Sequence, residues 1–150
     1  MYIDSVIFWN TVLSGIIIGL VVGGILGGFG YVIWKKQNDY SKRQDAYTSF
    51  MNSLYILNSL ILRLYEQREI NKDFVDEYLE KSNGREVYKT YLDNSIKFTF
   101  YFGDGYNKNS NAICAIFLKI TTNKDIEMTY EELETFLLSK VQIYVNIKFK

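Results

Sequence analysis

The sequence contains no histidine, no proline and only one cysteine among its 150 residues. Without histidine, mechanisms that need an imidazole base and metal sites that need histidine ligands are excluded. One cysteine can form neither an internal disulfide nor a thiolate cluster around a metal ion. The 17 lysine and arginine residues are balanced by 17 aspartate and glutamate residues. Because a broad basic surface needs an excess of positive charge, we expect no long nucleic acid as a partner.

Residues that could support catalysis are also scarce. Acidic residues cluster at 73–80 and 131–134, but on helices these spacings form a solvated face rather than a buried acid–base pair. Cys114 lies in an apolar stretch, where a thiol is usually inert packing. The phosphate-loop motif is absent, and the loop around Asp104 lacks the ligand pattern of an EF-hand. We therefore expect no enzymatic activity, no metal site and no cofactor.

The most prominent feature that is present is an uncharged run from Ser5 to Trp34. A helix needs about 20 mostly apolar residues to cross a hydrocarbon core roughly 30 Å thick. Aromatic residues lie near both ends of the run, as is typical of membrane interfaces. The run predicts a single transmembrane helix within residues 1–36. A cleaved signal peptide is less favoured, because Asp4 replaces the usual basic start and the apolar run is too long.

Basic residues follow this run, whereas only Asp4 precedes it. Lys35, Lys36, Lys42 and Arg43 come directly after the predicted span. Under the positive-inside rule, this asymmetry keeps the C-terminal part in the cytoplasm. The predicted location is therefore the inner (plasma) membrane, with the N-terminus outside. The opposite orientation is the alternative.

Glycines recur every four residues in the same run, at Gly15, Gly19, Gly23 and Gly27. Small residues at this spacing form a stripe that a second helix can approach closely. The stripe predicts association between helices and, in our interpretation, a homo-oligomer. The alternative is that glycine is simply common in membrane helices. The stripe does not identify whether the partner is a second copy or another protein.

Residues 37–70 are predicted to form a helical stalk. Apolar residues on alternating steps of three and four make an a/d seam, a pattern that indicates a coiled coil and a second oligomerisation surface. An amphipathic helix that packs on its own domain is at least as compatible, and further apolar residues beside the seam favour it slightly. The seam consists of Tyr47, Phe50, Leu54, Leu57, Ile61 and Leu64.

Residues 71–150 are predicted to form a small α+β head. Helices are expected over 71–81 and 85–93, and Thr129 with Glu132 makes a capping box that opens another helix ending near residue 140. Alternating apolar and polar residues over 95–102 and 141–149 are typical of half-buried strands, and the apolar run 112–120 of a buried strand. The predicted fold class is therefore α+β: one transmembrane helix, a helical stalk, and a cytoplasmic head with about three strands and flanking helices.

The polar faces of these strands suggest a ligand platform. Tyrosine rings can stack on bases, and lysine ammonium groups can pair with phosphates. The platform predicts a nucleotide or another anionic ligand, whereas the alternative is an ordinary solvated sheet face. Its residues are Lys97, Tyr101, Tyr144 and Lys148, with Lys119 near them.

Together these patterns predict a non-enzymatic, single-pass membrane protein. It would self-associate through the glycine stripe and bind a protein partner or an anionic, nucleotide-like ligand through its head. By analogy of architecture alone, such a protein would act as a membrane effector. The alternative function is that of a structural accessory subunit in a larger membrane complex.

Overall fold

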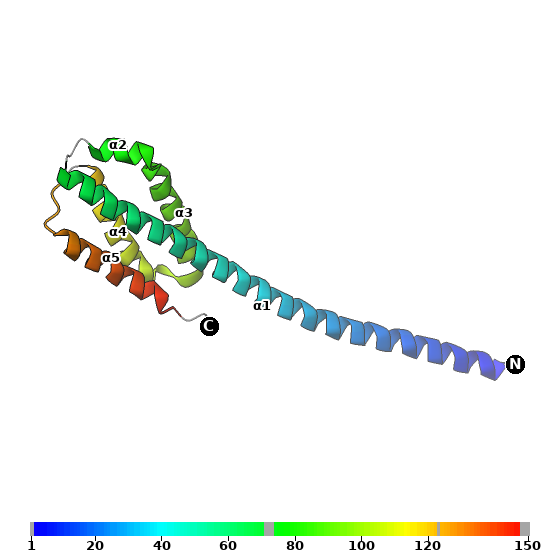
Figure 1. Ribbon diagram of the computed structural model, residues 1–150. Helices are drawn as coiled ribbons and strands as arrows, with labels where there is room; N and C mark the ends of the chain where they lie inside the picture. The colour runs from blue at the N-terminus through cyan, green and yellow to red at the C-terminus, as the bar shows by residue number, and fades with distance from the viewer. Residues whose placement is uncertain (1, 71–73, 123, 148–150) are drawn as a thin grey trace. The chain divides into compact units, whose positions relative to one another are not determined.

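The computed structural model describes the backbone of residues 2–70, 74–122 and 124–147, and the side chains of residues 19–69, 74–122 and 124–147. The chain divides into two compact units, Met1–Lys42 and Arg43–Lys150. Within the described ranges every regular element is helical, as Figure 1 shows. The elements are α1 (Tyr2–Ile70), α2 (Phe74–Lys81), α3 (Gly84–Phe102), the short 3-10 helix η1 (Asp104–Tyr106), α4 (Asn107–Thr121) and α5 (Tyr130–Val145).

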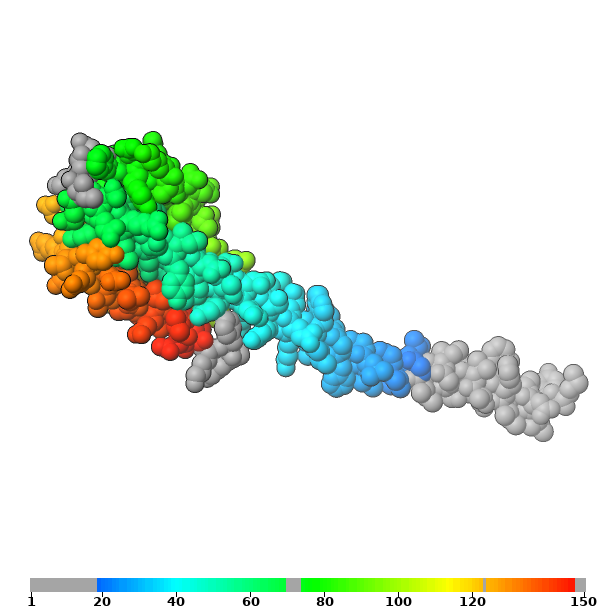
Figure 2. Space-filling model, in the orientation of Figure 1, coloured from blue at the N-terminus to red at the C-terminus, as the bar shows by residue number. Residues whose placement is uncertain are grey.

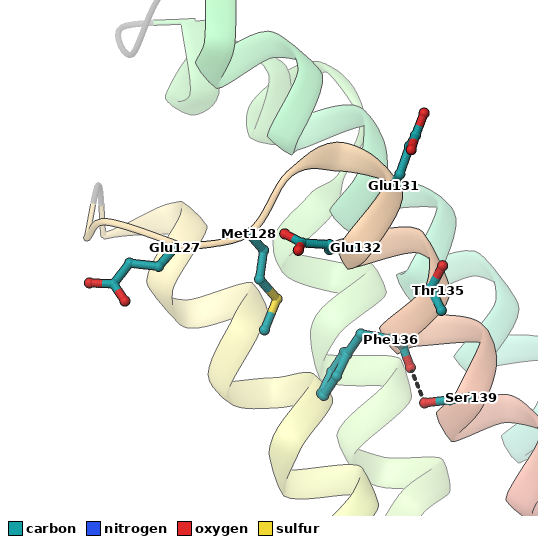
Figure 3. A pocket seen from close by; sticks show the side chains of 7 residues that line it. All are labelled: Glu127, Met128, Glu131, Glu132, Thr135, Phe136 and Ser139. Atoms are coloured by element: carbon teal, nitrogen blue, oxygen red, sulfur yellow. Dashed lines mark hydrogen bonds between the residues drawn. The ribbon is translucent and has the colours of Figure 1, made fainter.

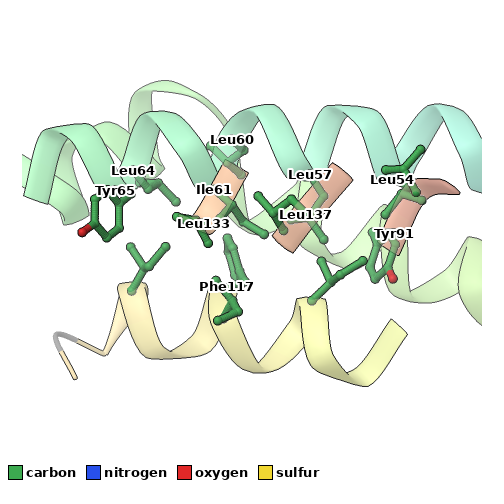
Figure 4. Close-up of a cluster of buried hydrophobic side chains, with 14 of the residues drawn as sticks. Leu54, Leu57, Leu60, Ile61, Leu64, Tyr65, Tyr91, Phe117, Leu133 and Leu137 are labelled. Atoms are coloured by element: carbon green, nitrogen blue, oxygen red, sulfur yellow. The ribbon is translucent and has the colours of Figure 1, made fainter. Parts of the chain in front are cut away.

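The core of the second unit forms around the part of α1 that belongs to it. Figure 4 shows the apolar side chains of α1 directed toward Phe117 of α4, with Leu133 and Leu137 of α5 between them. Each fully buried side chain of this size contributes roughly 1.5–3 kcal/mol to folding. The space-filling view shows the same part of α1 exposed as a band between α2 and α5 (Figure 2). One face of α1 is therefore the centre of the core, and another remains at the surface.

Aromatic rings close the core where α1, α3 and α5 meet. The ring of Phe50 stacks on Phe98 with centroids 4.5 Å apart, and it meets Tyr144 edge-on at 4.8 Å. Tyr91 lies 5.7 Å from the same ring. Such pairs add about 0.5–1.5 kcal/mol each beyond the burial of their area. Phe50 therefore connects three helices that are far apart in the sequence.

The start of α5 confirms a prediction from the sequence. Glu132 N donates to the Thr129 hydroxyl oxygen at 3.3 Å, and Thr129 N donates to the Glu132 carboxylate at 2.8 Å. These two hydrogen bonds are the predicted capping box. The end of α5 was predicted less well, because the helix continues past residue 140 to Val145.

The predicted α+β class is wrong, because the three predicted strands lie in helices. Residues 95–102 belong to α3, in which Tyr91 and Phe98 are buried while Ile96 and Phe100 are exposed. Those buried positions follow a spacing of seven residues, which is two helical turns. The alternation of apolar residues over 95–102 therefore did not indicate which of them are buried, because half of these apolar residues face solvent on a helix.

The other two predicted strands are corrected for related reasons. Residues 112–120 lie in α4, whose buried positions 110, 113, 116, 117 and 120 have helical spacing. A continuous apolar run is compatible with a buried helix as well as with a buried strand, so the run alone could not distinguish the two. Residues 141–145 continue α5 because no glycine or proline stops the helix after residue 140, and residues 146–147 follow its end. Residues 148–149 of that predicted strand lie outside the described residues.

The prediction of a single-pass membrane protein is also contradicted. Over the residues that the structure describes, no helix is both long enough and apolar enough to span a membrane. The described side chains of the apolar run cover only residues 19–34, and glycine occupies six of those positions. A membrane span needs about 20 mostly apolar residues. This finding also contradicts the predicted inner-membrane location, in which the N-terminus lies outside and the rest of the chain in the cytoplasm.

Candidate functional site

The five residues of the predicted ligand platform lie on different helices. Lys97 and Tyr101 belong to α3, Lys119 to α4 and Tyr144 to α5, and Lys148 lies outside the described residues. The side chains of Lys97 and Lys119 are exposed. Since no sheet exists in the described ranges, the common face that the prediction required is missing. Ligand binding at these residues stays a prediction, but the shared sheet face on which it was based is not present in the described ranges.

Tyr144 in particular is part of the core. Its side chain is 0% exposed, and its hydroxyl donates to the Tyr106 carbonyl oxygen at 3.2 Å. Burial raises the pKa of Tyr144 to about 12, with smaller effects from Cys114 and Tyr106. The ring therefore stabilises the packing of α5 and offers no face for stacking on a base.

The predicted a/d seam is also buried within its own unit. Tyr47 is half-buried and its hydroxyl donates to the Tyr144 carbonyl oxygen at 3.4 Å. The other five residues of the seam are fully buried in the core: Phe50, Leu54, Leu57, Ile61 and Leu64. Of the two interpretations of the seam, the structure matches the amphipathic helix that packs on its own domain.

An open cleft of about 660 Å³ lies beside the start of α5 (Figure 3). Met128 and Phe136 give it an apolar side, and Glu127, Glu131 and Glu132 line it with carboxylates. The carboxylates of Glu127 and Glu131 point away from each other in Figure 3. Because Glu132 is already an acceptor in the capping box, the acidic groups do not converge on one point.

A second cleft, of about 360 Å³, runs between α1 and the α2–α3 region. Arg63 supplies its positive charge, and the hydrogen bond with Tyr78 raises the pKa of that guanidinium. A smaller cleft of about 180 Å³ also includes Ile56 and Val87, which line the larger one. Arg63 was not among the site residues predicted from the sequence. The missed signal was its distance of one heptad from Ile56, a spacing that puts both on one side of α1.

Hydroxyl groups form a buried network between α3 and α4. Ser110 Oγ lies 2.7 Å from both the Tyr91 hydroxyl and Ser95 Oγ. Burial raises the pKa of the nearby Cys114 thiol, an effect that its hydrogen bond with Tyr88 partly offsets. A protonated thiol is a weak nucleophile. This network satisfies polar groups inside the core, and no base is positioned there to activate one of them among the described contacts.

The glycine-rich segment presents a different kind of surface. Residues 19–34 lie in α1, and their large apolar side chains are exposed by roughly half or more. A Cβ atom built on Gly19, Gly23 or Gly27 meets nothing within 4 Å. The surroundings of Gly15 lie outside the described side chains. Exposed apolar side chains in a row make this segment a candidate for contact with a partner.

No group of acidic or cysteine side chains in the described ranges has a metal-binding arrangement. No family model matches this chain, and no curated protein or solved structure shows significant similarity to it.

Proposed function

We propose that the chain is a non-enzymatic assembly protein that associates with further copies of itself through residues 19–34. The second unit, Arg43–Lys150, is then the folded domain that each copy brings to the assembly. The observation that carries this proposal is the exposure of the apolar side chains on all sides of the helix in residues 19–34.

The exposed positions surround the helix axis. Successive residues point about 100° apart, so the neighbours Leu20, Val21 and Val22 cover three directions. They are 72%, 54% and 48% exposed. A helix that is hydrophobic all round is normally buried on all sides. The remaining large apolar side chains of the segment are exposed as well: Ile25, Leu26, Phe29, Tyr31, Val32, Ile33 and Trp34.

The glycines favour a helix as the partner. Gly19, Gly23 and Gly27 are four residues apart and share one face, with about 6 Å between successive positions. The open space around them lets another backbone approach closely, so that many weak dispersion contacts and Cα–H hydrogen bonds form together. A second copy carries the same stripe and can supply a complementary surface.

The energies are compatible with a stable assembly. Each large apolar side chain removed from water contributes roughly 1.5–3 kcal/mol. Association costs an estimated 4–15 kcal/mol in lost translational and rotational freedom. Covering several side chains on each of two helices therefore outweighs this cost.

The test is the molar mass of the purified full-length chain, measured by light scattering. We expect a defined oligomer for the natural sequence and a clear loss of mass for the Gly19→Leu, Gly23→Leu double variant. The added side chains keep the segment apolar but hold the backbones apart.

The matched control is Val21→Ala with Ile25→Ala. These two residues have the same spacing and lie about 200° around the helix from the glycines. The control variant should retain the oligomer. A natural chain that is monomeric at all concentrations would overturn the proposal, and equal masses for both double variants would show that the glycines do not form the contact.

A further inference from the structure

Helix α3 carries an exposed apolar stripe on the second unit. Leu92, Ile96 and Phe100 are four residues apart and are 36%, 70% and 83% exposed. Single exposed apolar residues are normal on a protein surface, whereas a contiguous stripe of them often marks an interaction site. The ring of Phe100 meets Tyr101 edge-on, with centroids 5.1 Å apart. This contact helps to hold the most exposed ring in place.

Charged residues of both signs run along one side of this stripe. Asp93 and Lys97 each follow a stripe residue by one position, so both lie on the same flank. Both side chains are exposed. A flank with an acid and a base one helical turn apart can complement an inverted copy of itself.

We propose that α3 pairs in antiparallel fashion with α3 of a second copy, about a two-fold axis near Ile96. In this register Ile96 meets its own counterpart, and Leu92 packs against Phe100 of the second copy. A two-fold interface is isologous, so the same contact occurs twice. This interface is separate from the association through residues 19–34 and does not rest on it.

The charges identify a second copy as the occupant. In an antiparallel pair, the flanks on the same side of the two helices face each other. Asp93 then lies opposite Lys97 of the second copy, and Lys97 lies opposite Asp93. A parallel pair in register would instead place the two flanks on opposite sides of the interface, where Asp93 and Lys97 could not meet their counterparts. The stripe is thus complementary to itself in one orientation, which sets both partner and direction.

The experiment measures thiol crosslinking in the full-length chain. Ile96→Cys places a thiol near the proposed axis, so a short bismaleimide should join two copies efficiently. Leu138→Cys is the matched control, since Leu138 is a 57% exposed apolar residue on α5. The natural chain, which retains the half-buried Cys114, gives the background. Crosslinking at position 96 that is no greater than at position 138 would overturn the proposal.

Charge reversal tests the register within the Ile96→Cys chain. Asp93→Lys alone and Lys97→Asp alone each set like charges against one another and should lower crosslinking severalfold. The double reversal, Asp93→Lys with Lys97→Asp, restores opposite charges and should recover it. Failure of the double reversal to recover would exclude the antiparallel register. Because this readout depends on α3 and the mass change of the glycine variant depends on residues 19–34, either interface can fail without the other.

Discussion

The glycines of the two units have opposite surroundings. In the first unit, Gly19, Gly23 and Gly27 have open space where a side chain would be. In the second unit, a Cβ atom on Gly84 would lie 2.6 Å from Cδ2 of Leu79, a buried residue. The glycines of the first unit have open space beside them, whereas a side chain at Gly84 would collide with a buried neighbour.

The apolar side chains show the same contrast. From residue 46 onward the large side chains at core positions are buried against other helices of their own unit. In residues 19–34 they are exposed. The comparison teaches that hydrophobic residues specify a fold only where the same chain supplies the opposing surface. Elsewhere, as we propose for residues 19–34, they are available to a partner.

The largest effect that would test this comparison is the loss of a core ring. Phe50→Ala should destabilise the second unit by about 3–5 kcal/mol, because Phe50 is 0% exposed and contacts Phe98 and Tyr144. Denaturant unfolding followed by circular dichroism measures the change.

Two controls sharpen that result. Tyr55→Ala removes a ring of similar size from the same helix at a position that is 51% exposed, and it should cost far less. Leu26→Ala lies in the first unit and should leave the unfolding of the second unit unchanged. A loss at Tyr55 as large as that at Phe50 would contradict the assigned core.

The sequence was sufficient for features set by neighbouring residues. The capping box at Thr129 was predictable because its hydrogen bonds join residues three apart. The helical stalk over 37–70 was predictable because its apolar residues repeat with helical spacing, and it lies within α1. Residues 95–102 were not, since Ile96 and Phe100 mimic a strand pattern while facing solvent on a helix. Only the opposing surfaces of α1, α4 and α5 decide which side of that helix is inside.

The candidate sites were harder to predict for the same reason. Tyr144 was assigned to a ligand face from its place in an alternating pattern, but the helix turns it into the core. The cleft that includes Arg63 and Tyr78 joins residues from α1 and α2, and no local motif connects them.

A smaller effect distinguishes the two kinds of glycine. Gly84→Ala should destabilise the second unit by about 1–3 kcal/mol, the usual cost of an extra methyl group in a filled core, because Cδ2 of the buried Leu79 would have to shift. Gly27→Ala, which meets nothing within 4 Å, should leave the unfolding of this unit unchanged. Thermal or denaturant unfolding of both variants gives the comparison. If the Gly84→Ala variant were as stable as the natural chain, this result would contradict the close packing of Gly84 against Leu79 at the start of α3.

The smallest expected effect concerns the buried hydroxyl of Tyr144 and depends on pH. Burial raises the pKa of Tyr144 from 10 to about 12 in the folded chain. The unfolded chain therefore loses this proton at lower pH than the folded chain does. It follows that the stabilising contribution of the neutral hydroxyl is complete below pH 10 and is lost as the pH rises toward 12.

Tyr144→Phe removes the hydrogen bond to the Tyr106 carbonyl oxygen and should cost about 0.5–1.5 kcal/mol at pH 8. Urea unfolding of both chains at pH 8, 10 and 11 should show this difference shrinking as the pH rises, because only the natural chain carries the titrating group. A difference that stays constant over this range would mean that the hydroxyl is not held neutral by burial, and that Tyr144 lies closer to water than the rest of the core.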